Sequence, residues 1–216
     1  MAWGQCIEQY GTGEPYMPVL EALGRLARTP DGEQLKRVLA QYAPTWLAQM
    51  PALLSAADEE ALQRRVLGVT RDRMLREIAE ALEVLTNEQS LILVLEDLHW
   101  ADASTLELLA MLARRPDQVR LLVLGTYRPV EVLGNGHPLN GVIHELRTHS
   151  LCRELTLQSL REEDVAAYLR ERFPHSMFPT RLAEVLHRRT EGNPLFVVST
   201  IDDLVRQGVM LQVDED

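Results

Sequence analysis

A run of five aliphatic residues that ends in two adjacent acids constrains the fold of this chain more than any other feature. Residues 91–95 read Leu-Ile-Leu-Val-Leu, and Glu96 and Asp97 follow directly. A continuous apolar run of this length is typical of a strand buried on both faces of a parallel sheet. Residues 119–125 repeat the pattern, and a helical pattern lies between the two runs. The sequence therefore predicts an α/β fold with a right-handed strand, helix, strand unit and both acids at a strand's carboxyl end.

Helical spacing of apolar residues predicts further helices before and after this unit. Ser104 and Glu107 fit a capping box at the start of a helix that runs to about residue 115. Residues 58–85 read as one long helix whose apolar stripe packs on the sheet. The other expected elements are a strand end over 3–7, a turn over 11–15, helices to about 28, over 35–42 and over 139–146, and a last strand over 152–157.

The last quarter of the chain changes character. Residues 161–207 read as three helices separated by breaks at Phe-Pro pairs and at the Gly-Asn-Pro sequence of residues 192–194. We therefore divide the chain into an α/β domain over residues 1–158 and a small helical subdomain over 159–216. This subdomain is expected to run into the start of a following domain.

The net charge argues against several classes of partner, and the cysteine content indicates free thiols. The net charge is -10, from 32 acidic and 22 basic residues, which disfavours attraction to nucleic acids and to anionic membranes. The longest apolar run is far shorter than the roughly 18 residues of a membrane span. Cys6 and Cys152 lie far apart and are expected to be free, buried thiols. With no signal-peptide pattern at the start, the sequence predicts a cytoplasmic protein without direct nucleic-acid binding.

Two adjacent carboxylates after a buried strand have the form of a Walker B element. One acid would hold Mg²⁺ directly or through water, and the other would orient the attacking water. Burial makes such a pair costly unless a cation is present. Two alternatives stay open: a strand that ends in an acidic turn, and an unrelated hydrolytic activity that uses His99 with Asp97.

Several segments carry a family resemblance. Residues 95–102, Leu-Glu-Asp-Leu-His-Trp-Ala-Asp, resemble the extended Walker B element of the STAND class of signal-transduction ATPases. The same element is similar to that of AAA-type modules in bacterial LuxR-like transcriptional regulators and multidomain adenylate cyclases. Residues 4–10 with 14–16 resemble the segment after the family's second strand, and residues 124–129 resemble its sensor-1 strand. Residues 190–196, Thr-Glu-Gly-Asn-Pro-Leu-Phe, resemble the Gly-x-Pro element of its helical lid.

The resemblance implies a P-loop NTPase sheet followed by a helical lid, with ATP and Mg²⁺ as ligands. Glu96 and Asp97 would hold Mg²⁺ and the hydrolytic water, and which acid takes which role stays open. Arg128 would contact the γ-phosphate with its forked guanidinium, and a surface ion pair is the alternative. Asn193 and Pro194 would contact the adenine; a helix cap followed by proline at the first helical position is a compatible alternative.

The chain departs from the family at the phosphate-binding loop. Such a loop needs a Gly-rich backbone followed by Lys and then Ser or Thr. Lys36 is the sole Lys and lies in an expected helix, and Gly-Thr-Gly at residues 11–13 has no Lys after it. The resemblance places the family's first strand and loop ahead of residues 3–8. We therefore expect a module without its Walker A strand, whose open sheet edge pairs with a second copy, a partner or that N-terminal segment.

Two functions follow from these expectations. The first is the truncated ATP-binding module of a bacterial signal-transduction or transcription regulator, which on its own hydrolyses ATP poorly or not at all. ATP binding and hydrolysis would switch the intact parent between two forms. The second is a non-enzymatic interaction scaffold derived from that module, which works by pairing through its incomplete sheet. Binding of Mg-ATP distinguishes the two.

Overall fold

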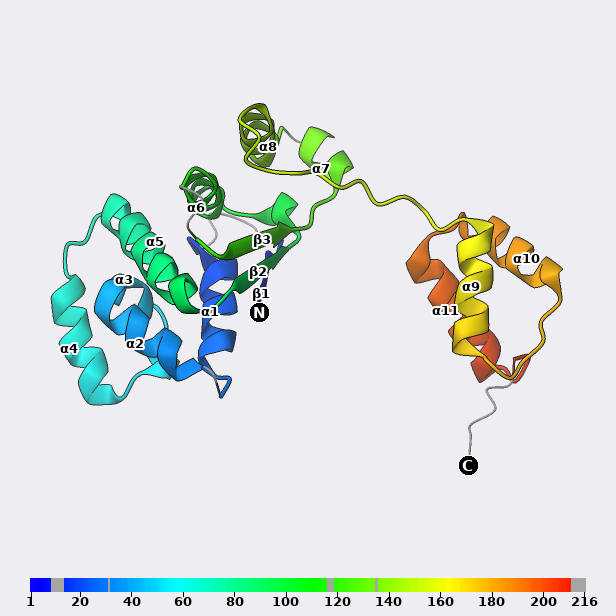
Figure 1. Cartoon of the computed structure of the whole chain (residues 1–216), viewed down its shortest axis with the longest axis horizontal. Helices are drawn as coiled ribbons and strands as arrows, with labels where there is room; N and C mark the ends of the chain where they lie inside the picture. The colour runs from blue at the N-terminus through cyan, green and yellow to red at the C-terminus, as the bar shows by residue number, and fades with distance from the viewer. Residues whose placement is uncertain (9–13, 31, 116–118, 135, 211–216) are drawn as a thin grey trace. The chain divides into compact units, whose positions relative to one another are not determined.

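The chain divides into two compact units. The computed structural model describes residues 1–8, 14–30, 32–115, 119–134 and 136–210. Unit 1 covers Met1–Arg153 and unit 2 covers Glu154–Asp216 (Figure 1). The expected turn over residues 11–15 falls mostly outside the described residues.

Unit 1 is built on a three-stranded parallel sheet. Its strands are β1 (Ala2–Gln5), β2 (Leu91–Glu96) and β3 (Leu121–Gly125), in the order β1-β2-β3. Trp3 pairs with Val94, and the β2 to β3 register places Leu95 opposite Gly125. Because the strands are parallel, their carboxyl ends meet at one edge of the sheet. The α/β class and the partial P-loop NTPase fold that the sequence predicted are confirmed.

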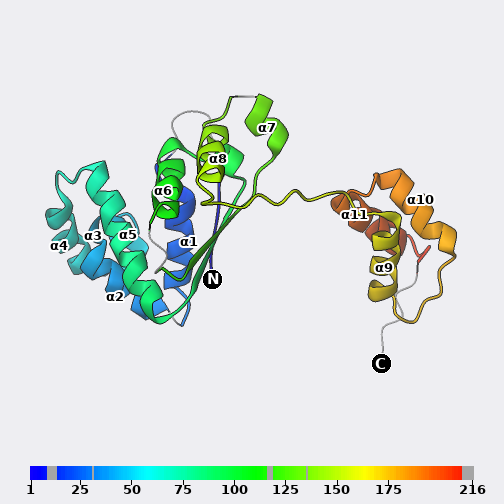
Figure 2. The same ribbon diagram turned by 45° about the horizontal axis from the view of Figure 1, so that its top comes forward.

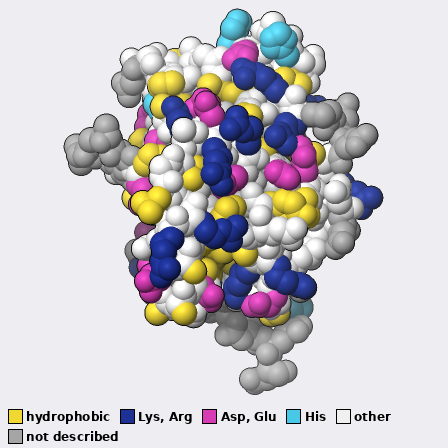
Figure 3. All heavy atoms as spheres, turned by 90° about the vertical axis from the view of Figure 1, so that its left-hand side faces the viewer, with side chains coloured by type: hydrophobic (Ala, Val, Ile, Leu, Met, Phe, Trp, Pro, Cys, Tyr) yellow, Lys and Arg dark blue, Asp and Glu magenta, His cyan; other side chains and the backbone are white. Residues whose placement is uncertain are grey.

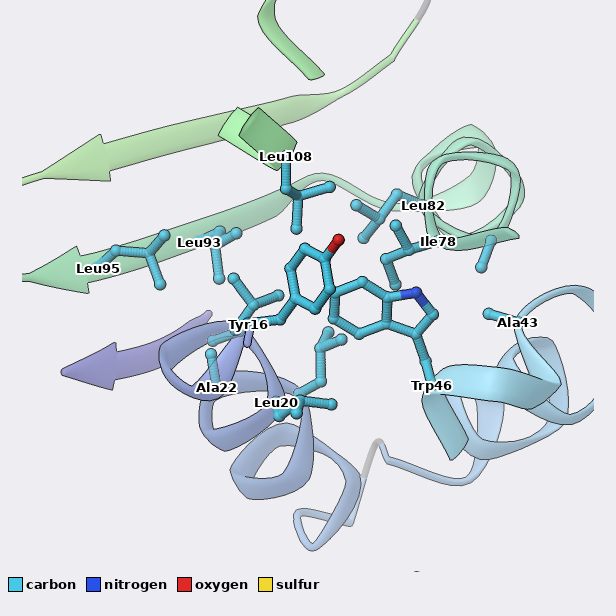
Figure 4. Packing of buried hydrophobic residues seen from close by; sticks show 14 of the residues in the cluster. Tyr16, Leu20, Ala22, Ala43, Trp46, Ile78, Leu82, Leu93, Leu95 and Leu108 are labelled. Carbon is cyan, nitrogen blue, oxygen red and sulfur yellow. The ribbon is translucent and has the colours of Figure 1, made fainter. Parts of the chain in front are cut away.

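The helices of unit 1 are α1 (Met17–Ala27), α2 (Gly32–Tyr42), α3 (Pro44–Leu47), α4 (Ala56–Val66), α5 (Arg71–Glu88), α6 (Ala103–Ala113), α7 (Pro129–Gly134) and α8 (Leu139–Thr148), with 3₁₀ turns η1 (Pro51–Leu53) and η2 (Leu98–Trp100). Helices α1, α5 and α6 lie on one side of the sheet (Figure 2). The main core forms between these helices and the side chains of β2 that face them (Figure 4).

The other face of the sheet is open. Leu93 and Leu95 point into the core, whereas Ile92 on the opposite face is 37% exposed. Leu122 and Leu124 of β3 share that opposite face and are 51% and 47% exposed. The prediction that β2 is buried on both faces is therefore wrong, because no described helix of unit 1 covers these three side chains.

Close packing of β1 on α1 depends on a glycine. A Cβ atom on Gly4 would lie 1.9 Å from the carbonyl oxygen of Pro18 and 3.3 Å from the Cβ of Ala22. No side chain fits at that distance from a backbone atom, so only glycine permits this approach. The contact fixes the position of Gln5, the next residue of β1, at the carboxyl edge of the sheet.

Two local expectations for unit 1 need correction. The long helix predicted over residues 58–85 is two helices, because the chain turns through Gly68 at φ 74° between α4 and α5. The main neighbours of helix α5 are α2 and α3, while its Ile78 and Leu82 also join the core that contains Leu93 of β2. The cap of α6 is Asp102 and not Ser104, since the Asp102 carboxylate accepts hydrogen bonds from the backbone N–H groups of Ser104 and Thr105.

The segment predicted as a last strand is not one. Residues 152–157 form irregular chain, and Leu155 and Leu157 are 73% and 93% exposed. A strand is stabilised by a hydrogen-bonded neighbour, and no described strand pairs with this segment. Cys152 at its start is exposed, so the expectation of two buried thiols holds only for Cys6.

Unit 2 contains the three predicted helices, α9 (Glu162–Arg172), α10 (Thr180–Thr190) and α11 (Pro194–Arg206). Their core is formed by Val165, Leu169, Phe173, Ala183, Leu186, Val197, Ile201 and Met210. The turn between α10 and α11 contacts the segment before α9, where the N–H of Leu160 donates a 2.8 Å hydrogen bond to the carbonyl of Gly192.

Surface charge is mixed over the helical side of unit 1. Figure 3 shows Lys and Arg side chains interspersed with Asp and Glu. Ion pairs such as Arg64 with Glu60 at 2.7 Å and Lys36 with Glu33 at 2.6 Å contribute to this mixture. This face therefore presents no large field of one sign. Among the described helices, none is long and apolar enough to cross a membrane.

Candidate functional site

The two predicted acids stand at the carboxyl edge of the sheet. Glu96 is the last residue of β2, and its carbonyl accepts a 2.9 Å hydrogen bond from the N–H of Cys6. Asp97 follows in the left-handed conformation, at φ 58° and ψ 42°, and turns the chain into η2. Aspartate is one of the few residues besides glycine that adopts this conformation at modest cost. The turn directs the chain away from the strand immediately after Glu96.

Residues from both neighbouring strands hold Asp97 in place. The Nε2 of Gln5, at the end of β1, donates a 3.0 Å hydrogen bond to Oδ2 of Asp97. The backbone N–H of Asp97 donates to Oγ1 of Thr126, which follows β3, over 3.1 Å. Sequence reasoning missed both residues. Their positions in the sequence could have identified them. Each is a polar residue at or just after the end of a strand that was expected to run parallel to β2.

Glu96 has the properties of an available metal ligand. Its side chain is half-buried and makes no hydrogen bond or ion pair with any of the described residues. The Asp97 side chain is 26% exposed, so its carboxylate also meets solvent. Mg²⁺ prefers oxygen ligands, usually keeps several waters, and is commonly bound through one or two carboxylates together with substrate phosphates. Within the described ranges, no group of three His, Cys, Asp or Glu side chains forms a fuller metal cluster.

His99 lies in η2, two residues after Asp97. Its imidazole is fully buried, and Nδ1 accepts a hydrogen bond from the backbone N–H of Arg128 over 3.4 Å. Its Nε2 lies 4.0 Å from Oδ1 of Asp97 and 3.5 Å from Oε2 of Glu131. A general base must reach the proton that it removes. Because the imidazole is closed off from solvent, the geometry does not favour the alternative hydrolytic pair of His99 with Asp97.

Arg128 reaches the same edge from the end of β3. Its guanidinium is 65% exposed and its Nη1 lies 3.1 Å from Oε1 of Glu131, which is the surface ion pair left open as an alternative. The guanidinium carbon lies 5.9 Å from the ring centre of Trp100. An exposed pair of this kind contributes little to stability and exchanges partners readily. Arg128 thus lies just after the end of β3, and its guanidinium contacts Glu131 and Trp100 rather than Glu96 or Asp97.

Asn193 and Pro194 belong to unit 2. The Oδ1 of Asn193 accepts hydrogen bonds from the N–H groups of Leu195 and Phe196, at 3.0 and 3.5 Å. Pro194 is the first residue of α11. The local geometry is that of a helix cap followed by proline at the first helical position. Both residues thus have a structural role in starting α11.

A family comparison agrees with this arrangement. The family model described as AAA ATPase domain matches residues 2–124, which is more than half of the chain. The chain belongs to the AAA ATPase domain family. No curated protein and no solved structure matches it. The matched segment contains β1, β2 with Glu96, Asp97 and all but the last residue of β3, and it ends before Arg128, Asn193 and Pro194.

Members of the AAA family are ATPase-type P-loop modules that bind nucleotide and Mg²⁺ in general. Glu96 and Asp97 offer the carboxylate oxygens that such a cation prefers. The sequence lacks the usual phosphate-binding element, because it has no Gly-rich loop followed by Lys and Ser or Thr. The sole Lys, Lys36, lies on α2 and pairs with Glu33. The donor set at Glu96 and Asp97 is therefore of the type that Mg²⁺ prefers, and the sequence contains no phosphate-binding loop.

A hollow beside the site of this AAA module is acidic. Its described lining includes Glu8, Glu14 and Asp102 together with Cys6, Trp100 and His137, and no Lys or Arg. Burial, together with the charges of Asp102 and Asp97, raises the pKa of the Cys6 thiol to about 12. Burial also lowers the pKa of His137, and the neighbouring His99 lowers it as well. The electrostatics of the hollow thus repel phosphate and favour cations.

Proposed function

We propose that this AAA module binds a divalent cation at Glu96 and Asp97 and works within a bacterial signal-transduction or transcription regulator. The observation that supports this most is the free Glu96 carboxylate beside an Asp97 carboxylate held by Gln5. When bound there, Mg²⁺ would neutralise charge on the phosphates of ATP. The regulator role rests on the resemblance of residues 95–102 to the STAND class.

Each residue at this site has a separate proposed role. Gln5 and Thr126 fix the carboxylate and backbone of Asp97, so that one acid has a set orientation while Glu96 stays free to bind. Arg128 offers an exposed guanidinium at the same edge, suited to phosphate oxygens once it leaves Glu131. In unit 2, the capped start of α11 at Asn193 and Pro194 is proposed to contact the adenine.

Completion of the sheet is part of the proposal. Among the described strands, β3 pairs only with β2, so its other edge is free. Leu122 and Leu124 of β3 are exposed on the open face of the sheet. We propose that an N-terminal strand with a phosphate-binding loop, outside these 216 residues, pairs with this edge of β3. The chain on its own then hydrolyses ATP slowly or not at all, because it has no cradle to position the phosphates.

Calorimetric titration tests the site. We expect Mn²⁺, used as a probe for Mg²⁺, to bind the isolated chain with one saturable site. The double variant Glu96→Ala/Asp97→Ala should weaken this binding by more than the roughly 10- to 100-fold typical of losing a supporting partner. Glu80→Ala removes an exposed acid of α5 and serves as the matched control. Mn²⁺ binding that survives in the double variant would contradict the proposal.

The same titration with Mg-ATP separates the two functions. Saturable binding that is lost in the double variant supports the ATPase-type module even without a phosphate loop. A folded chain that binds Mn²⁺ and no Mg-ATP supports the need for an added phosphate-binding segment. A chain that binds neither ligand leaves the interaction scaffold as the better interpretation.

The alternative function is a non-enzymatic scaffold that pairs with a second copy of itself. The open face of the sheet, formed by Ile92, Leu122 and Leu124, favours it because exposed apolar patches beside a free strand edge promote association. We expect Leu122→Glu/Leu124→Glu to weaken self-association at least ~10-fold, since carboxylates would be buried there. Sedimentation equilibrium measures this.

Leu67→Glu provides the control for that experiment. Leu67 is 81% exposed and lies between α4 and α5, away from the open face. A wild-type chain that remains monomeric, or a Leu67 variant that dissociates equally, would argue against pairing through the sheet.

A further inference from the structure

His99 has an unusual buried nitrogen. Among the described residues, its Nε2 is the buried side-chain nitrogen or oxygen that lacks a hydrogen-bond partner. A buried polar atom without a partner costs about 1–3 kcal/mol. Its persistence beside two carboxylates points to a role other than packing.

The hydrogen bond at the other ring nitrogen sets the tautomer of His99. The backbone N–H of Arg128 donates to Nδ1, so Nδ1 is the acceptor and carries no proton in the neutral ring. The proton of the neutral imidazole is therefore on Nε2. This atom is a donor, and its surroundings must supply an acceptor.

Two carboxylates from different elements lie nearest to this donor. Oδ1 of Asp97 lies 4.0 Å away, and Oε2 of Glu131 on α7 lies 3.5 Å away. The remaining oxygens are already used: Oδ2 of Asp97 accepts from Gln5, and Oε1 of Glu131 pairs with Arg128. Oδ1 of Asp97 and Oε2 of Glu131 are therefore the carboxylate oxygens left to accept from Nε2–H. The Nε2–H of His99 thus lies between Asp97 of the proposed cation site and Glu131 in the first turn of α7.

We propose that His99 is a positioning residue whose Nε2–H alternates between Asp97 and Glu131 and so couples the cation site to α7. This rests on the proposed cation site. A divalent cation draws electron density from the Asp97 carboxylate and makes it a poorer acceptor. Nε2–H then bonds Glu131, which is held from both sides by His99 and Arg128. Cation binding in this way orders the start of α7.

Hydrogen exchange measured by mass spectrometry tests the coupling with Mn²⁺ as the probe. The relevant amides are those of Glu131 and Val132, which donate to the carbonyl of Arg128 in the first turn of α7. We expect Mn²⁺ to slow their exchange several-fold in the wild-type chain. Glu131→Ala should abolish this slowing, whereas Val130→Ala, an exposed position on the same helix, should keep it.

Two substitutions of His99 isolate the role of Nε2. His99→Gln places an amide donor near Nε2, and His99→Asn keeps only the atoms near Nδ1. We expect the Gln variant to retain the Mn²⁺-dependent slowing. The Asn variant should lose it and bind Mn²⁺ about 10-fold more weakly, as is typical when a supporting partner is removed.

The outcomes separate this inference from the proposed function. A wild-type chain that does not bind Mn²⁺ overturns both. A wild-type chain that binds Mn²⁺ without any change at α7, or two His99 variants that behave alike, overturns the coupling and leaves the cation site intact. If the His99 variants do not fold, as judged by Trp fluorescence, the comparison of Glu131→Ala with Val130→Ala still decides the question.

Discussion

Replacing Trp46 with Ala is expected to lower the free energy of unfolding of unit 1 by about 3–5 kcal/mol. The indole is fully buried between the helices of the main core (Figure 4). Its ring centre lies 5.0 Å from that of Tyr16, and its Nε1 donates a 2.9 Å hydrogen bond to the carbonyl of Met74. The substitution leaves a large cavity and removes this hydrogen bond. Since domains are typically stable by about 5–15 kcal/mol, unit 1 would lose much of its stability.

Urea unfolding followed by Trp fluorescence measures this loss. Trp3 and Trp100 remain as reporters, and both lie in unit 1. Trp46→Phe is the matched control, because it keeps an aromatic ring against Tyr16 and loses only the larger ring and its hydrogen bond. We expect a clearly smaller loss for Phe. A loss below about 1 kcal/mol for the Ala variant, as for an average substitution, would contradict the central position of Trp46.

The second large effect is expected for Gly192→Ala in unit 2. Gly192 has φ +69°, and a Cβ atom there would lie 2.0 Å from the carbonyl oxygen of Leu160. The left-handed conformation costs a non-glycine residue roughly 1–2 kcal/mol. The clash with a backbone atom costs about 1–3 kcal/mol more, because no change of rotamer relieves it. The turn that leads into Asn193 should therefore separate from the segment before α9.

Gly208→Ala is a closely matched control. Gly208 has φ +70°, and a Cβ atom there meets nothing within 4 Å. The two variants share the conformational cost and differ in the clash. Hydrogen exchange of the amides of α9 to α11 measures the stability of unit 2, while Trp fluorescence reports that unit 1 is unchanged. Equal losses for the two variants would show that the contact between Gly192 and Leu160 does not hold the turn.

Much of the fold follows from local sequence patterns. The aliphatic run before Glu96 and the apolar periodicity of α1, α2, α8 and the helices of unit 2 identify their elements, because backbone periodicity and side-chain type act within a few residues. The position of the two acids follows equally, since residues after a parallel strand lie at its carboxyl edge. These predictions need no knowledge of distant contacts.

Other predictions failed where a distant neighbour or a single backbone angle decides the outcome. Residues 152–157 alternate as a strand does, yet a strand also requires a partner, and pattern alone does not supply one. The split of the long helix depends on one residue, Gly68, whose left-handed backbone interrupts a periodicity that continues across it. Exposure of Ile92 depends on whether another element covers the second face of the sheet.

The candidate site shows the same division. The order of residues in the chain suffices to place Glu96 and Asp97 together after a strand, because the chemistry of adjacent acids is local. The support for Asp97 comes from Gln5 and Thr126, which lie 92 and 29 positions away along the chain. Only the parallel pairing of three strands brings them to one edge. Burial of His99 between Asp97 and Glu131 is likewise a property of the tertiary structure, since it requires β2, β3 and α7 to meet.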